Sequence, residues 1–284
     1  MTPKYSGKQI IKAGEALIKE NIDLNGNEFE AAFDVLSYWR FSHEKPLEEA
    51  ISLLEQVASK IDRHAIFAKR LKRYISIVTK LKRFPDMKLK NMQDIGGCRA
   101  IISNPKKLQQ VIRELKKRPE FKTNGHKRIK FKDYIKKPKD DGYRGYHIIG
   151  KFGTRTDSKR NIELQIRTQL QHDWATTLEI VDLFTGQALK SNQGEKNWEA
   201  FFKGVSEQFA LMEEIHLFDT FDKGRKNIEY INLLKSSGAN LINSCKTVQN
   251  QARKLNIVKK LDAYAHSLKI LDKKIDDASF DGYV

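Results

Sequence analysis

Apolar residues recur every three or four positions through most of the chain, and this spacing is typical of amphipathic helices. It predicts a helix over residues 27–41, NEFEAAFDVLSYWRF, and another over residues 45–61, where Pro46 suits the first turn. A third helix is predicted over residues 63–84, RHAIFAKRLKRYISIVTKLKRF, ending before Pro85.

The pattern changes near residue 96, where short runs rich in β-branched residues indicate strands. The predicted strands are 96–103, 146–153 and 161–168, and the predicted helices that follow or separate them are 105–118, 169–184 and about 195–276. This mixture predicts an α+β fold in which a small sheet is flanked by many helices.

The chain is strongly basic, with 53 Lys and Arg against 36 Asp and Glu and a formal net charge of +17. The excess is concentrated in residues 69–90, with nine basic residues and one acid, and in residues 116–139, with eleven and two. A positive field of this size attracts phosphate, so nucleotides, nucleic acid and anionic membrane are all candidate partners.

Two cysteines, Cys98 and Cys245, in 284 residues make no disulfide framework and favour a reducing compartment. The N-terminal residues lack the apolar run of a signal peptide. No segment reaches the roughly 18 apolar residues of a membrane span. We therefore expect a cytoplasmic protein without a membrane partner.

Two acids stand out against this basic background. Asp94, in MQDIGGCRAII, lies between a predicted helix and a predicted strand. Glu163 lies on the strand NIELQIRT, where it shares one face with Gln165 and Arg167 if the alternate residues are buried. Each acid alone is more typical of a turn or a solvated strand. Together they would suit a Mg²⁺ ion that bridges nucleotide phosphates.

The segment RLKRYISIVTKLKR, residues 70–83, is cationic and has no acid four residues away to pair with its charges. Such a run is usually only a solvated helix face. Beside two carboxylates it could instead hold a triphosphate. The chain has neither GxxxxGK[ST] nor GxGxxG, so ATP would have to be bound by basic side chains. His147 and His172 lack an HExxH pattern, which argues against zinc.

The stretch DYIKKPKDDGYRGYH, residues 133–147, combines turn residues with lysines and tyrosines. Tyr143 follows Gly142, so we expect an exposed ring that stacks on a base, with Lys139 and Arg144 beside it for phosphate. Tyr146 begins a strand, and we expect its ring to pack inward.

Three of these segments, DIGGCRAII, DYIKKPKDDGYRGYH and IELQIRT, resemble in order and spacing the core motifs of RelA/SpoT-type synthetases, and RLKRYISIVTKLKR resembles their ATP-binding helix. The resemblance covers about residues 70–175. It implies a nucleotidyltransferase-like core in residues 63–190, with helices in 1–62 and a helical extension in 191–284. The HD metal motif of the family's hydrolase domain is missing ahead of this core, which resembles a small, synthetase-only member.

The resemblance implies a pyrophosphokinase that transfers the β,γ-pyrophosphate of ATP to the 3′-hydroxyl of GDP or GTP. Asp94 and Glu163 resemble the Mg²⁺ ligands, and Glu163 could also accept the hydroxyl proton. The residues that resemble the ATP side are Arg70, Lys72, Ser76, Lys80 and Arg99. Those that resemble the acceptor side are Lys139, Tyr143, Arg144, His147, Gln165 and Arg167.

Other functions fit the same residues. Some small members of the family pyrophosphorylate the 3′ CCA end of tRNA, and others use adenosine nucleotides as acceptors. The charge of +17 would also suit tRNA. A non-catalytic nucleic-acid-binding protein is a third alternative, although Asp94 and Glu163 would then only repel the polyanion. Helices outside the core are candidates for homo-oligomer contacts.

Overall fold

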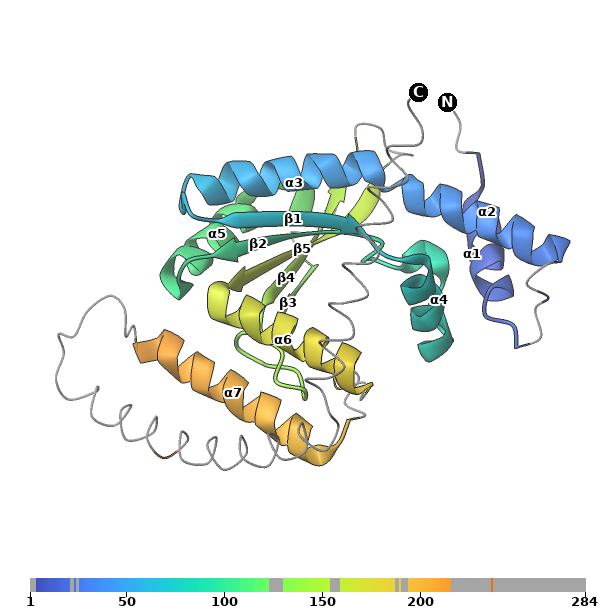
Figure 1. Ribbon diagram of the computed structural model, residues 1–284. Helices are drawn as coiled ribbons and strands as arrows, with labels where there is room; N and C mark the ends of the chain where they lie inside the picture. The colour runs from blue at the N-terminus through green and yellow to red at the C-terminus, as the bar shows by residue number, and fades with distance from the viewer. Residues whose placement is uncertain are drawn as a thin grey trace, which may run out of the picture. The chain divides into compact units, whose positions relative to one another are not determined.

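The structure is a computed structural model (Figure 1). It describes residues 4–20, 23, 26–122, 130–153, 159–186, 189, 194–215 and 236. The chain divides into two compact units. The first comprises residues up to 137 together with 145–169, and the second comprises residues 138–144 together with residues from 170 onward. The predicted division at residues 62 and 190 stays a prediction.

A five-stranded mixed sheet forms the centre of the first unit, with the strand order β1-β2-β5-β4-β3. The pair β2 and β5 is parallel, and the other three pairs are antiparallel. The strands are β1 (Ile66–Leu71), β2 (Gly96–Ile102), β3 (Lys130–Asp133), β4 (Tyr146–Phe152) and β5 (Arg160–Thr168).

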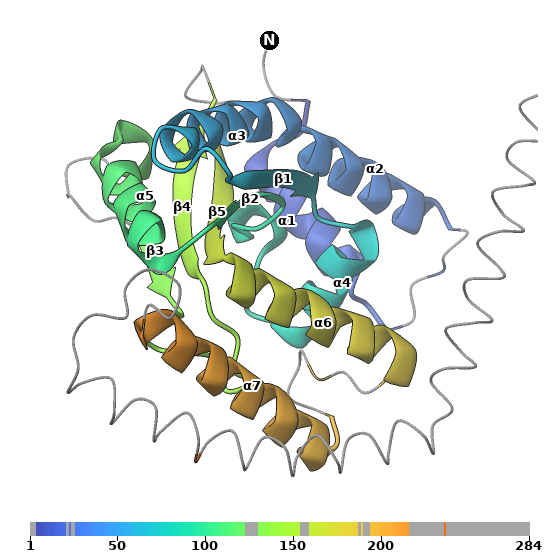
Figure 2. The same cartoon turned by 60° about the vertical axis from the view of Figure 1, so that its left-hand side comes forward.

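One face of this sheet is covered by α3 (Glu44–Ser59) and α5 (Pro105–Lys117), as Figures 1 and 2 show. Both helices place an apolar stripe on the sheet, and the buried residues of both belong to one cluster with the apolar side chains of β2, β4 and β5. On β5 the buried residues Ile162, Leu164 and Ile166 alternate with half-buried Glu163 and Gln165. The predicted alternation is therefore confirmed, and the polar side chains are left on the other face.

A second apolar cluster joins α1 (Gly7–Ala16), α2 (Asn27–Phe41) and α4 (Tyr74–Arg83) around the short helix η1 (Leu89–Asn91). Leu36 and Ile77 are fully buried in it. Since η1 leads directly into Asp94 and β2, this packing determines where the chain enters the sheet.

The second unit contains most of α6 (Gln169–Thr185), together with α7 (Lys196–Ile215) and the loop 138–144. Trp174 of α6 donates its indole N–H to the carbonyl oxygen of Phe202 on α7 at 2.8 Å. The predicted helix beyond residue 215 lies outside the described residues, apart from residue 236.

The prediction of one helix over residues 63–84 is wrong in its first half. Residues Ile66–Leu71 form the edge strand β1, and the helix α4 begins only at Tyr74. Pairing with β2 gives the backbone of β1 its hydrogen bonds, and because most of β1 is exposed its side chains show little alternation. The second half is confirmed, because α4 ends at Arg83, before Pro85.

The sequence also gave no indication of β3. Its four residues, KFKD, are short, charged and mostly exposed, as is common for an edge strand. The other predicted helices and strands within the described residues are confirmed to within a few residues at their ends. No helix among the described residues is both long enough and apolar enough to cross a membrane.

Candidate active site

The two acids predicted from the sequence lie on one cleft of about 190 Å³ in the first unit. Asp94 reaches it from the segment before β2, and Glu163 reaches it from the polar face of β5. The cleft is lined by Ala68, Lys69, Arg70, Lys72, Asp94, Gly97, Cys98, Arg99, Glu163 and Gln165. Four cationic side chains and two carboxylates therefore share one small hollow.

The strand register explains how these residues meet. Arg70 of β1 pairs with Gly97 of β2, and Gly97 pairs in turn with Glu163 of β5. Gly97 has no side chain, and a Cβ built there would have only the Glu163 carbonyl oxygen, at 3.6 Å, within 4 Å. A methyl group would thus fit the protein but would stand between Arg70 and Glu163. The second glycine of DIGGC keeps this row of the cleft open.

Asp94 is held by two lysines. Its Oδ2 accepts a hydrogen bond from Lys72 Nζ at 3.1 Å, and its Oδ1 lies 2.8 Å from Lys80 Nζ. The second contact is an ion pair that lacks hydrogen-bond geometry. Both carboxylate oxygens of Asp94 therefore face a positive charge, and a carboxylate in such a position can also serve as a metal ligand.

Glu163 is held by its neighbours on the sheet. His147 Nδ1 lies 3.1 Å from its Oε1, and Gln165 donates to its Oε2 at 2.9 Å, while Arg167 donates to Gln165 at 2.8 Å. Burial alone would raise the pKa of Glu163, but the hydrogen bond and charge of His147, the Gln165 hydrogen bond and the charge of Lys80 together lower it to about 2. The carboxylate is therefore ionised at neutral pH.

Lys80 links the two acids. It is ion-paired with Asp94, and it is also close enough for its charge to lower the pKa of Glu163. Because one ammonium group acts on both carboxylates, Asp94 and Glu163 face a common space. A Mg²⁺ ion typically uses only one or two protein carboxylates, with phosphate and water completing its shell. The two acids fit that requirement, although the described residues hold no cluster of three His, Cys, Asp or Glu.

Three of the residues predicted for the ATP side line the cleft, and a fourth, Lys80, does not line it but is ion-paired with Asp94. Arg70 and Arg99 line the cleft from neighbouring strands, and Lys72 lines it from the end of β1. Ser76 is not among the lining residues, although it lies one turn before Lys80 on α4 and shares its helix face.

The predicted acceptor residues are divided between the two units. His147, Gln165 and Arg167 belong to the first unit and form the hydrogen-bonded row beside Glu163. Lys139, Tyr143 and Arg144 belong to the second unit, where they form a separate group in the loop 138–144.

The expectation of an exposed Tyr143 ring is wrong. Its exposed fraction is 9%, because the ring packs edge-on against Trp174 with centroids 6.5 Å apart. Lys139 Nζ lies 4.6 Å from the centre of the same ring, as expected of a cationic neighbour. The role of Tyr143 in stacking stays a prediction. The inward packing of Tyr146 is confirmed, with an exposed fraction of 1%.

Sequence reasoning missed the residue that holds this loop. Ser206 of α7 donates to the Gly142 carbonyl oxygen at 2.5 Å and accepts from Arg144 Nε at 3.1 Å. Gly142 has a φ of +91°, and a Cβ there would lie 3.2 Å from Lys203 and Ser206 of α7. No pattern in the sequence points to a serine 62 positions away from Arg144.

Comparison with known proteins identifies the segment that builds the cleft. Residues 69–180 match the family model described as a region found in RelA/SpoT proteins. This segment is a RelA/SpoT synthetase region. It includes the loop 138–144 and every lining residue of the cleft except Ala68.

Two curated proteins of Bacillus subtilis (strain 168) are similar to the RelA/SpoT region. GTP pyrophosphokinase YjbM is 33% identical over 112 residues, which are 38% of this chain and 51% of the relative. GTP pyrophosphokinase YwaC is 33% identical over 116 residues, which are 38% of this chain and 52% of the relative. The chain is thus distantly homologous to GTP pyrophosphokinases, and it spans about half the length of these two relatives.

Solved structures show the same fold. Small alarmone synthetase 1 of Bacillus subtilis, bound to its product pppGpp, superposes with a TM-score of 0.53 at 23% identity, covering 63% of this chain and 94% of that one. Small alarmone synthetase 2 gives a TM-score of 0.52 at 24% identity, covering 63% and 94%. The predicted α+β fold with a mixed sheet and flanking helices is confirmed.

Proposed function

We propose that the protein is an ATP-dependent pyrophosphokinase that transfers the β,γ-pyrophosphate of ATP to the 3′-hydroxyl of GDP or GTP. The observation that carries the proposal is the meeting of Asp94 and Glu163 in a cationic cleft within a RelA/SpoT region. The homologues named GTP pyrophosphokinase support the choice of a guanosine nucleotide as acceptor.

Arg70, Arg99, Lys72 and Lys80 would bind ATP. The planar guanidinium groups of Arg70 and Arg99, on adjacent strands, suit an adenine ring or a phosphate. When ATP is bound, the ammonium groups of Lys72 and Lys80 would interact partly with the triphosphate instead of with Asp94. They would thereby neutralise part of the triphosphate charge. The cleft would thus use charge and position, which are the main requirements of phosphoryl-group transfer.

Asp94 and Glu163 would hold Mg²⁺, which supplies charge neutralisation at the ATP phosphates when bound. In the reaction, a bond forms between the acceptor 3′-oxygen and the β-phosphorus of ATP. The bond from that phosphorus to the bridging oxygen of AMP breaks, and the hydroxyl proton passes to a base. Glu163, with a pKa of about 2, is a weak proton acceptor in the resting protein. Its negative charge is therefore the more useful property, and His147 lies beside it with Nδ1 3.1 Å from its Oε1.

The experiment is label transfer from γ-³²P-ATP with Mg²⁺, offering GDP, GTP, ATP and bulk tRNA as separate acceptors. Label on GDP or GTP supports the proposal. Label on tRNA or on an adenosine nucleotide identifies one of the alternative pyrophosphokinases. If no acceptor gains label, the protein is not a pyrophosphokinase for these substrates and the non-catalytic alternative is favoured.

A further inference from the structure

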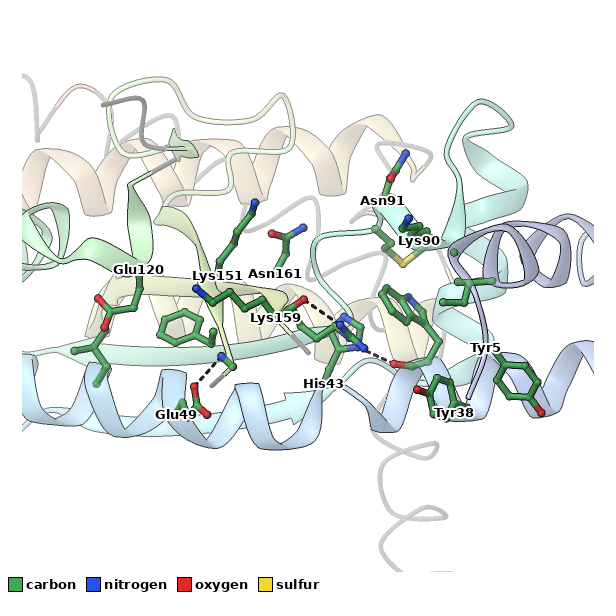
Figure 3. Close-up of a pocket in the computed structure, with 18 of the residues that line it drawn as sticks. Tyr5, Tyr38, His43, Glu49, Lys90, Asn91, Glu120, Lys151, Lys159 and Asn161 are labelled. Atoms are coloured by element: carbon green, nitrogen blue, oxygen red, sulfur yellow. Dashed lines mark hydrogen bonds between the residues drawn. The ribbon is translucent and has the colours of Figure 1, made fainter. Parts of the chain in front are cut away.

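A second hollow in the first unit, lined by described residues and larger than the cleft, is a cavity of about 870 Å³ (Figure 3). It lies where β4 ends and β5 begins, and its walls also include parts of α1, α2, α3, η1 and η2 (Pro119–Phe121). It shares no lining residue with the cleft. None of the residues assigned above to ATP, acceptor or metal lies on it.

The wall of this cavity carries several cationic side chains. Lys90, Lys122, Lys151 and Lys159 reach it from four different segments. Within the described part of the chain, none of the four forms an ion pair. Figure 3 shows Lys151 and Lys159 on one side and Lys90 on the other. Among the described residues, these four ammonium groups therefore have no carboxylate paired with them.

Arg160 adds a fifth positive charge, and it is fixed in place. Its Nε donates to Ser42 Oγ at 2.9 Å and its Nη1 donates to the Lys159 carbonyl oxygen at 3.0 Å. Its guanidinium carbon lies 4.6 Å from the centre of the Trp39 ring. A buried and immobilised guanidinium provides a preorganised positive potential in the wall of the cavity.

The remaining titratable groups on the wall do not cancel this charge. Burial lowers the pKa of His43 to about 4, and the positive charge of Arg160 acts in the same direction. The hydrogen bond to the Trp39 carbonyl opposes this shift only in part. His43 is therefore neutral at pH 7. Glu49 accepts a hydrogen bond from the Gly153 amide at 2.8 Å, and Glu120 is the other carboxylate among the described lining residues. Among the lining residues that the structure describes, five cationic groups thus face two carboxylates.

Trp39 lines the cavity with its ring, and the Arg160 guanidinium lies over that ring. The indole N–H of Trp39 is buried away from the cavity surface and has no hydrogen-bond partner among the described residues. The lysines of the wall, rather than this N–H, would therefore provide the counter-charges for the phosphate groups of a ligand.

We propose that this cavity is a second anion-binding site, distinct from the cleft, which takes a phosphate-bearing small molecule of about nucleotide size. The volume lies within the range of about 300–1,000 Å³ found for small-molecule pockets. The proposal concerns binding only and does not depend on the transfer reaction.

The site is also connected to the cleft through one strand. Asn161 lines the cavity and Glu163 lines the cleft, and these residues lie on the same face of β5. A ligand that binds Asn161 and Lys159 is therefore positioned to influence the strand that carries Glu163.

The test is to count binding sites by isothermal titration calorimetry, using inorganic tripolyphosphate and the full chain without Mg²⁺. The proposal predicts about two sites per chain. The variant Lys151→Ala/Lys159→Ala should lose one of them or bind there at least about tenfold more weakly, and Arg70→Ala/Lys72→Ala should lose the other.

The matched control is Lys106→Ala/Arg113→Ala, which removes the same charge from the exposed surface of α5. It should leave both sites intact. Lys151 and Lys159 are exposed, so their replacement should not alter the unfolding temperature. If the wild type has only one site, or if the control weakens binding as much as Lys151→Ala/Lys159→Ala does, the proposal is wrong. If Lys151→Ala/Lys159→Ala impairs the binding of bulk tRNA and leaves that of tripolyphosphate unchanged, the surface is an RNA contact instead.

Discussion

The cleft and the loop 138–144 hold their proposed binding residues in different ways. In the cleft, Arg70, Glu163 and Gln165 sit on strands, so backbone pairing sets their positions. In the loop, Tyr143 and Arg144 are positioned by side chains of α6 and α7. A change in the cleft should therefore alter chemistry and leave the fold intact, whereas a change in the loop should alter acceptor binding together with local stability.

The largest effect is expected from Asp94→Asn. The substitution keeps the shape of the side chain but removes the charge that faces Lys72 and Lys80. We expect pyrophosphate transfer to fall by about 10³-fold, the scale associated with losing one strong electrostatic contact in an active site. The measurement is the initial rate of label transfer, with the unfolding temperature recorded in parallel.

Asp86→Asn is the matched control, because Asp86 is exposed and the change in charge is identical. It should have the wild-type rate. Wild-type activity in Asp94→Asn would contradict the assignment of Asp94, and a collapse of the fold would contradict the contrast between cleft and loop.

Tyr143→Leu tests whether the loop combines binding with packing. Leucine fills most of the space beside Trp174 but cannot stack on a base. We expect the acceptor KM to rise by about 30-fold, within the 1–3 kcal/mol range of base stacking, with little change in the KM for ATP. Tyr143→Phe keeps the ring and should behave as wild type in both measurements. Equal acceptor KM values for Leu, Phe and wild type would show that Tyr143 is only a packing residue.

Ser206→Ala should have a smaller effect on the same loop. It removes the hydroxyl that joins Arg144 to the Gly142 carbonyl, but it leaves Arg144 itself in place. We expect about a fivefold rise in the acceptor KM, because one hydrogen bond to a charged group is lost. The turnover number at saturating acceptor should change little, and Ser206→Thr should restore part of the loss.

Ser52→Ala, on the exposed face of α3, is the control for removing a helical serine. If Ser206→Ala lowers the turnover number and leaves KM unchanged, α7 does not act by positioning Arg144.

The smallest expected effect concerns Glu163 and pH. Its folded pKa of about 2 lies below the ordinary value of 4.5, so its ionised form contributes stability above about pH 4.5 that is lost as the pH falls towards 2. Glu163→Gln lacks this contribution. The difference in unfolding free energy between wild type and Glu163→Gln should therefore be on the order of 1–2 kcal/mol at pH 6 and should narrow below pH 4.5. Urea titrations at pH 6, 4 and 3 would measure it, and a difference independent of pH would contradict the interaction with His147.

Much of the fold followed from local pattern. The helix at residues 27–41 and the alternation on β5 could be predicted because an element with one buried face has apolar residues at regular spacing in its sequence. The edge strands β1 and β3 were not predicted, because exposed strands have no buried face to impose alternation. Their strand character depends on hydrogen bonds to partners far away in the chain.

The site shows the same division. The sequence supplied Asp94, Glu163 and the basic residues around them, because motif order and charge can be read along a chain. It could not show that Lys80 acts on both acids, that the Tyr143 ring is buried against Trp174, or that Ser206 holds Arg144.

By itself, the sequence determined the residue types, the helical and buried-strand segments, and the membership of residues 69–180 in a RelA/SpoT region. Tertiary structure alone decided which charges meet and which rings are buried. It also created the cavity of about 870 Å³, whose lysines come from four separate segments. The physical reason is that hydrophobic periodicity shows which face of a helix or strand is buried but not which residues it contacts. A site consists of particular contacts between residues that are distant in the chain, and these contacts form only when the strands and helices pack together.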